Sequence, residues 1–121
     1  MMHRRHLLAA SALLPAAAAA QAPFPDRALT VVVGFPPGGQ ADLAARPVAA
    51  AMERNLRQPV VVQNRPGGAG AIGSGVVARA APDGHMLLMA LSSLAVIPEA
   101  ERLFGRPAPY EVSQFAPIGL V

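Results

Sequence analysis

The chain of 121 residues carries ten Arg and no Lys against seven acidic residues, which gives a formal net charge of +3. It has no Cys, so disulfides and thiol chemistry are excluded. The Arg residues are scattered and aromatic residues make up only 4% of the chain, which indicates no nucleic-acid partner. Two Arg fall in a predicted leader, and the remaining stretch of about a hundred residues suffices for one small domain but not for two.

Residues 1–22 are predicted to be a secretory signal peptide. A basic stretch, residues 3–6, precedes an apolar run over residues 7–20, and Ala20-Gln21-Ala22 offers a small-x-small cleavage site. Cleavage after Ala20 is the alternative to cleavage after Ala22, since the latter leaves a proline first. The run is shorter than the ~20 residues of a membrane-spanning helix, so no membrane anchor is predicted. An arginine pair leaves the twin-arginine route open, although Sec export is favoured.

The segment after the leader alternates between predicted strands and predicted helices. Runs of β-branched or apolar residues predict strands of a buried sheet, and apolar residues at helical spacing predict the helices between them. The strands are predicted at residues 29–33, 59–63 and 85–90, and the helices at residues 41–56 and 69–80. This order predicts two right-handed βαβ units, and therefore an α/β fold with a parallel sheet flanked by helices.

Finer expectations concern the two helices. Pro47 predicts a kink in the first helix or a restart at that residue, because proline lacks the backbone N–H that an interior position needs. The stripe predicted to be buried in the first helix consists of Leu43, Val48, Met52 and Leu56. The corresponding face of the second helix consists of Ile72, Val76, Val77 and Ala80.

The last part of the chain has a looser pattern. Proline and glycine punctuate residues 94–113, so one or two helical turns are expected there, over residues 99–104. Residues 115–121 are apolar and predict the beginning of a further strand. The competing interpretation of this segment is an exposed apolar edge with which a stand-alone α/β module docks onto a partner.

Three loops are predicted to lie at one end of the sheet, because each follows the carboxyl end of a parallel strand. They cover residues 35–40, 64–70 and 91–93. Two are glycine-rich starts of helices and the third supplies serine hydroxyls. Together they predict a crevice of N–H and O–H donors that suits a carboxylate or a phosphate. Ordinary turns, with Ser92 and Ser93 capping the backbone, remain the alternative.

Residues 68–73 read Gly-Ala-Gly-Ala-Ile-Gly, a literal G-x-G-x-x-G motif. A dinucleotide fold carries this motif after its first strand, with an acidic residue at the end of the next strand. Here the motif follows the second strand and no such acid follows, so a dinucleotide-binding domain is the weaker alternative. His85 is the one histidine outside the leader, with a solvent-facing side chain expected, and no nucleophile or metal set accompanies it. We therefore predict no enzyme and no cofactor.

Four blocks of residues, taken together, resemble a known family. They are Phe35-x-Pro37-Gly38-Gly39-x-x-Asp42-x-x-Ala45-Arg46, Gln58-Pro59-Val60-Val61-Val62-x-Asn64-Arg65-Pro66-Gly67, Val77-Ala78-x-Ala80-x-Pro82-Asp83-Gly84 and Phe115-Ala116-Pro117-Ile118. In this order and spacing they are similar to the Bug-type solute-binding receptors of tripartite tricarboxylate transporters. The resemblance implies a periplasmic, type II (Venus flytrap) binding protein that captures a small carboxylate or related organic solute for inner-membrane transporter subunits.

The resemblance also implies which residues hold the ligand. Phe35 would form an apolar wall. The donor loops would be formed by Gly38, Gly39 and Gln40, by Ala69 and Gly70, and by Ser92 and Ser93. Asp42 and Asn64 would organise the loops without touching the ligand. Gln40 stands where the family usually has Ser or Thr, and its size bears on which ligand fits.

Members of this family are more than twice as long as this chain. The resemblance therefore implies that residues 1–22 are the signal, that residues 23–114 form part of the first lobe, and that residues 115–121 begin the strand leading towards a second lobe. On this basis we expect a fragment with impaired transport activity.

Overall fold

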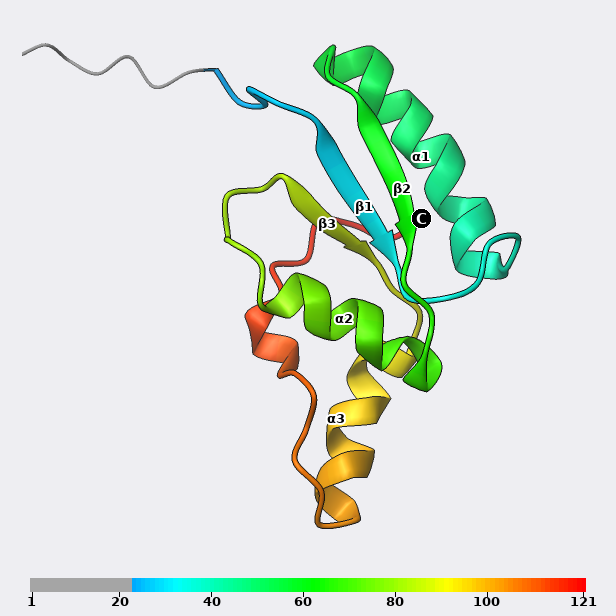
Figure 1. Ribbon diagram of the computed structural model, residues 1–121, viewed down its shortest axis with the longest axis vertical. Helices are drawn as coiled ribbons and strands as arrows, with labels where there is room; N and C mark the ends of the chain where they lie inside the picture. The colour runs from blue at the N-terminus through cyan, green and yellow to red at the C-terminus, as the bar shows by residue number, and fades with distance from the viewer. Residues whose placement is uncertain (1–22) are drawn as a thin grey trace, which may run out of the picture.

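The computed structural model describes residues 23–121, so the predicted signal peptide and its cleavage site lie outside the described residues. Three parallel strands form one sheet in the order β2-β1-β3 (Figure 1). They are β1 (Leu29–Val33), β2 (Val60–Asn64) and β3 (Met86–Met89). The central strand pairs with both neighbours in register, with Leu29 opposite Val60 and Thr30 opposite Met86. The predicted α/β fold with a parallel sheet flanked by helices is confirmed.

Helix α1 (Gln40–Leu56) packs against one face of this sheet. Its buried stripe consists of Ala41, Ala45 and Ala49, which lie against the β1 side chains at positions 29, 31 and 33. The predicted stripe is therefore wrong at Leu43, which is exposed. Methyl side chains at i, i+4 and i+8 bring the helix close to the sheet, and larger residues join the core only towards its end.

The same helix runs without interruption through Pro47, so the predicted restart is wrong. Proline removes the bond to the carbonyl four residues earlier, which here belongs to Leu43. Both residues are exposed, and water can therefore satisfy that carbonyl. The proline is tolerated because it lies on the solvent side of α1.

Helix α2 (Ala71–Ala78) packs on the other face, after a short 3-10 turn, η1 (Gly68–Gly70) (Figure 1). The residues of α2 that are buried are Gly73, Ser74 and Gly75, whereas the side chain of Ile72 is 56% exposed. The predicted apolar face is therefore wrong at Ile72. A helix that packs through glycines approaches the sheet more closely than one that packs through branched side chains.

Helix α3 (Ser93–Leu103) extends away from the sheet (Figure 1) and is longer than the one or two turns predicted. Its Pro98 is buried, and the hydroxyl of Tyr110 donates to the carbonyl of Leu94 at 3.0 Å, which fastens the following segment to the helix. A short 3-10 turn, η2 (Val112–Gln114), comes next. Residues 115–121 pair with no strand among residues 23–121, so the strand predicted there is not formed.

None of the helices within residues 23–121 is both long enough and apolar enough to cross a membrane.

Candidate functional site

The starts of the three α-helices lie at the edge of the sheet towards which all three strands point (Figure 1). The residues that precede the helices are Gly39, Gly70 and Ser92, and none of them caps its helix through a side-chain hydrogen bond within the described chain. The loops touch one another, because a Cβ atom placed on Gly70 would lie 3.2 Å from Phe35 Cζ and 3.7 Å from Ser93 Oγ. The predicted meeting of three loops at one edge is confirmed by this contact.

The first loop is held by the carboxylate of Asp42, which is only 2% exposed. Oδ2 accepts hydrogen bonds from the Gly38 N–H and from Arg46 Nε, both at 2.9 Å. Oδ1 accepts from Arg46 Nη2 at 3.0 Å and from Asn64 Nδ2 at 2.9 Å. The Arg46 guanidinium, followed by the Gly38 and Asn64 donors, holds the pKa of this carboxyl far below its usual range. Asp42 is therefore ionised throughout the physiological range.

Asn64 links this carboxylate to the end of β2. Its amide Nδ2 donates to the Phe35 carbonyl at 3.0 Å as well as to Asp42. The two residues expected to organise the loops thus both bond directly to the first loop. Arg46 was not predicted to take part, although an Asp and an Arg four residues apart on a helix are placed to pair. That spacing was the signal available in the sequence.

The N–H groups of the first loop that a ligand could bind differ from those expected. The N–H of Gly38 donates to Asp42, and the N–H of Gly39 donates to the Pro36 carbonyl at 3.3 Å. These two glycines therefore use their donors to shape the loop. The groups without an intrahelical partner are those of the first turn of α1, which begins at the exposed Gln40.

The second loop is held by close packing of glycines. A Cβ on Gly73 would lie 2.8 Å from the Gly34 Cα, and a Cβ on Gly34 would lie 2.9 Å from the Gly70 Cα. The N–H of Gly70 donates to the Gly67 carbonyl, and Gly70 adopts a positive φ of 100° that favours glycine. Two glycines of the G-x-G-x-x-G motif are therefore explained by contact between backbones. Ala69, between Gly68 and Gly70 in the turn, is exposed.

The third loop contributes the two serines. Ser92 is exposed, and its side chain does not cap α3 within the described chain, so the capping alternative is not what the structure shows for this residue. Ser93 is half-buried and directs Oγ towards Gly70. The residues expected to contact a ligand in the second and third loops therefore lie together.

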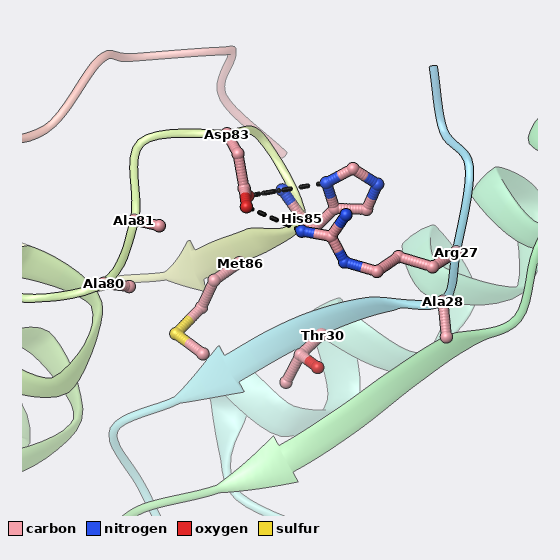
Figure 2. Close-up of a pocket in the computed structure, with 8 residues that line it drawn as sticks. All are labelled: Arg27, Ala28, Thr30, Ala80, Ala81, Asp83, His85 and Met86. Atoms are coloured by element: carbon pink, nitrogen blue, oxygen red, sulfur yellow. Dashed lines mark hydrogen bonds and ion pairs between the residues drawn. The ribbon is translucent and has the colours of Figure 1, made fainter. Parts of the chain in front are cut away.

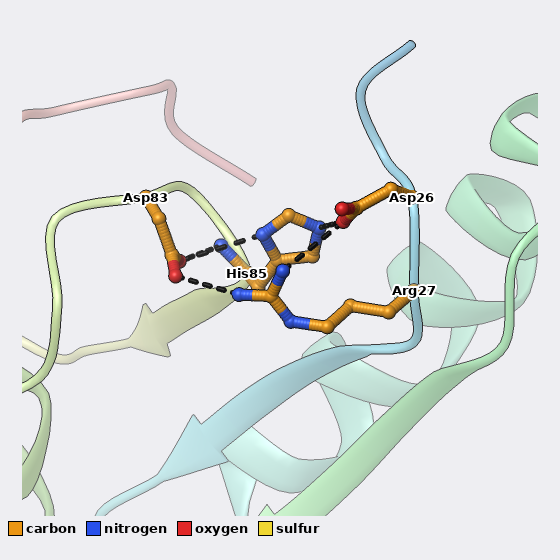
Figure 3. Close-up of polar contacts among 4 residues, drawn as sticks. All are labelled: Asp26, Arg27, Asp83 and His85. Carbon is orange, nitrogen blue, oxygen red and sulfur yellow. Dashed lines mark hydrogen bonds and ion pairs between the residues drawn. The ribbon is translucent and has the colours of Figure 1, made fainter. Parts of the chain in front are cut away.

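His85 lies at the opposite edge of the sheet, where the strands begin (Figure 2). It borders a cavity of about 240 Å³. Its ring lies between two carboxylates, with Nε2 3.0 Å from Asp26 Oδ1 and Nδ1 3.4 Å from Asp83 Oδ1 (Figure 3). Arg27 Nη2 donates to Asp83 Oδ2 at 2.6 Å. The side chain is only 11% exposed, so the expected solvent-facing histidine is wrong.

This opposite-edge cluster connects the N-terminal segment to the start of β3. It consists of charged pairs and a histidine, and Thr30 lines the same cavity (Figure 2). Across residues 23–121 no group of three His, Cys, Asp or Glu side chains could hold a metal ion. The contacts of Arg27 with Asp83 and of His85 with Asp26 join the N-terminal segment to the start of β3, which supports a structural role for the cluster.

Periplasmic binding proteins contain a parallel sheet whose helices begin at one edge, and solved proteins of this class match a large part of this chain. A structure described as that of a periplasmic transporter superposes with a TM-score of 0.67 at 42% identity, over 74% of this chain and 29% of the other. MatC from Rhodopseudomonas palustris, solved with bound malate, superposes with a TM-score of 0.52 at 46% identity, over 54% of this chain and 22% of MatC.

Residues 44–116 match the family described as the tripartite tricarboxylate transporter family receptor, and the chain belongs to this family. It is 39% identical to the protein BugT of Bordetella pertussis over 127 residues, which cover 99% of this chain and 38% of BugT. The family is one of solute-binding receptors, as the four sequence blocks indicated. The chain spans little more than a third of the length of the curated relatives that it matches first.

Proposed function

We propose that the chain provides part of a periplasmic site that captures a small carboxylate or related organic solute. The observation that carries the proposal is the meeting of three helix starts without side-chain caps at one edge of the sheet. The positive end of each helix dipole favours an anion, and the N–H groups in the first turn of α1 that have no intrahelical partner add donors for it. The malate bound to MatC, a relative with the same fold, agrees with a carboxylate ligand.

In this proposal the ligand lies against the three loops. Phe35 supplies an apolar wall, and Gln40 with the first turn of α1 supplies the donors of the first loop. Gly38 and Gly39 hold that loop in shape. The contacts from the other two loops are Ala69, Gly70, Ser92 and Ser93. Asp42 and Asn64 act through the loop and do not touch the ligand.

The wider setting is proposed from the family. Residues 1–22 direct export to the periplasm, residues 23–114 form part of a first lobe, and residues 115–121 lead towards a second lobe. The captured solute is passed to the inner-membrane subunits of a tripartite transporter. The chain performs no catalysis and requires no cofactor in this role.

The donors of this one edge set the affinity that we expect. A helix terminus contributes ~0.3–1 kcal/mol to a nearby anion and a charge-assisted hydrogen bond ~1.5–3 kcal/mol. Two of each give roughly 4–8 kcal/mol before the cost of immobilising the ligand, whereas micromolar binding requires about 8 kcal/mol net. We therefore expect millimolar binding of carboxylates by the 121-residue chain, and impaired transport.

The proposal is tested by titrating the isotopically labelled 121-residue chain with sodium malate and following backbone amide resonances by NMR. Saturable shifts are expected at Gln40, Gly70 and Ser93, with the His85 amide at the opposite edge as the internal control. 1,4-Butanediol, which is similar in length but uncharged, serves as the control ligand. Equal shifts with the diol, or malate shifts confined to the opposite edge, contradict the proposal.

A further inference from the structure

The first loop contains a charge that should work against an anion site. Asp42 lies in the first turn of α1, buried, and its carboxylate accepts the Gly38 N–H. Its oxygens are needed there, since they also accept from Asn64. An unpaired carboxylate at this position would cancel part of the positive potential at the helix start and would repel an anionic ligand.

Arg46 is placed to neutralise the charge of Asp42 while the carboxylate oxygens stay available as acceptors. It lies one turn further along α1, and its guanidinium donates from Nε to Oδ2 at 2.9 Å and from Nη2 to Oδ1 at 3.0 Å. This two-pronged pairing fixes the geometry of the carboxylate as well as its charge. The Arg46 side chain is 54% exposed, so it covers the carboxylate from the solvent side.

We propose that Arg46 is a positioning residue that neutralises Asp42 and so allows a carboxylate to shape the first loop without lowering its affinity for anions. The inference rests on the function proposed above. It assigns separate tasks to the two partners. The oxygens of Asp42 hold Gly38 and Asn64, and the charge of Arg46 preserves the potential that the ligand meets.

The decisive variant is Arg46→Gln, which leaves the carboxylate and its bonds to Gly38 and Asn64 in place. The Gly38 amide resonance of the ligand-free variant should stay close to that of the original chain, because that hydrogen bond is retained. Malate binding should weaken about tenfold at low ionic strength. At roughly 1 M salt, where the Debye length is ~3 Å, the loss should shrink, but by less than for an exposed charge, because Asp42 is buried.

Two further variants separate charge from structure. Asp42→Asn combined with Arg46→Gln removes both charges but also loosens the loop, because the new amide group faces the Gly38 or the Asn64 donor. Its loss of malate affinity relative to the original chain should therefore be the same at low and at high salt, unlike that of Arg46→Gln. Arg54→Gln removes the same charge from the last turn of α1 and serves as the matched control. It should bind malate like the original chain, since Arg54 lies at the far end of the helix.

The outcomes distinguish this inference from the proposed function. If the original chain binds malate and Arg46→Gln binds it equally well, or loses affinity by the same factor at every salt concentration, Arg46 has no electrostatic role and the inference fails alone. A loss in the double variant that shrinks with salt by the same factor as in Arg46→Gln overturns it as well. If the original chain does not bind malate at all, the proposed function fails and the inference falls with it.

Discussion

The first and second loops lie side by side at one edge of the sheet, yet different forces hold them. The first loop depends on a buried carboxylate that accepts four hydrogen bonds, one of them from Gly38 in the loop itself. The second depends on glycine packing, with backbones so close that no side chain fits between Gly34 and Gly73. The first is therefore sensitive to charge and the second to volume.

Because of this difference, the two loops contribute differently to the stability of the fold. The glycine contacts join the start of α2 to the end of β1, so they are part of the packing between a helix and the sheet. The Asp42 network joins the end of β2, the first loop and α1 through polar groups, and its loss leaves the alanine stripe of α1 in place. We therefore expect damage to the second loop to unfold the domain and damage to the first to loosen the site.

The largest effect is expected for Gly73→Ala. The new Cβ would lie 2.8 Å from the Gly34 Cα and 3.1 Å from the Arg65 carbonyl oxygen, and both are backbone atoms that cannot move aside. Overpacking of this kind should lower the free energy of unfolding by about 2–4 kcal/mol. Urea denaturation followed by circular dichroism measures the loss.

Gly75→Ala is the matched control for that variant, two residues further along α2. A Cβ there meets only the flexible guanidinium of Arg79, at 3.1 Å. The change should be neutral or should stabilise the helix by up to about 1 kcal/mol, since alanine has the higher helix propensity. Equal losses for the two variants would show that close packing does not hold the second loop.

The next largest effect is expected for Asp42→Asn. One acceptor oxygen is replaced by an amide group whose hydrogens face the donors of Arg46 or Gly38, so the network cannot be satisfied. The melting temperature should fall by roughly 8–15 °C, measured by circular dichroism. Asp26→Asn, at the exposed carboxylate near His85, is the control and should lower it by less than half as much. A smaller loss for Asp42→Asn than for Asp26→Asn would contradict the role given to the first loop.

Asn64→Ala should have a smaller effect, because it removes bonds from the edge of the network and leaves the pairing of Asp42 with Arg46 intact. Two hydrogen bonds from Nδ2 are lost, together with a longer one that Oδ1 accepts from Arg46 Nη2 at 3.5 Å, and the free energy of unfolding should fall by about 1–2 kcal/mol. Gln63→Ala, at the preceding residue of β2, is the control. The Phe35 amide should exchange faster with solvent in the first variant only, and unchanged exchange would place the restraint on the loop elsewhere.

The smallest effect is expected from mild acid. The pKa of Asp42 is depressed in the folded chain from an ordinary value of 3.8, so its contribution to stability is complete above that value. The contribution is lost only as the pH falls below about 4 and towards the folded pKa. The Gly38 amide shift should therefore stay constant between pH 7 and pH 5. A titration of that shift in this window, absent in Asp42→Asn, would show that the carboxylate is not held as described.

Much of the site could be predicted from residue order. The strand–loop–helix alternation placed three loops at one edge, and the family resemblance implied that Asp42 and Asn64 organise a loop. The available donors could not be predicted, since the N–H groups of Gly38 and Gly39 are used by Asp42 and Pro36 only in the folded loop. The four-residue spacing of Asp42 and Arg46 indicated that they pair on a helix, but the two hydrogen bonds between them depend on where α1 begins.

The sequence by itself determined the parallel α/β architecture, the approximate starts of the first two helices and the family, because these follow from periodicity, from turn residues and from motif order. It did not place the start of α3. Only the tertiary structure decided which helix faces are buried. Alanine and glycine stripes, which carry little hydrophobic signal, lie against the sheet, while Leu43 and Ile72 are left exposed. The physical reason is the distance between helix and sheet. A helix with small residues on its inner face comes closer to the sheet and gains van der Waals contacts along its whole length. The size of this gain depends on the shape of the opposing sheet surface, which the sequence of the helix does not contain.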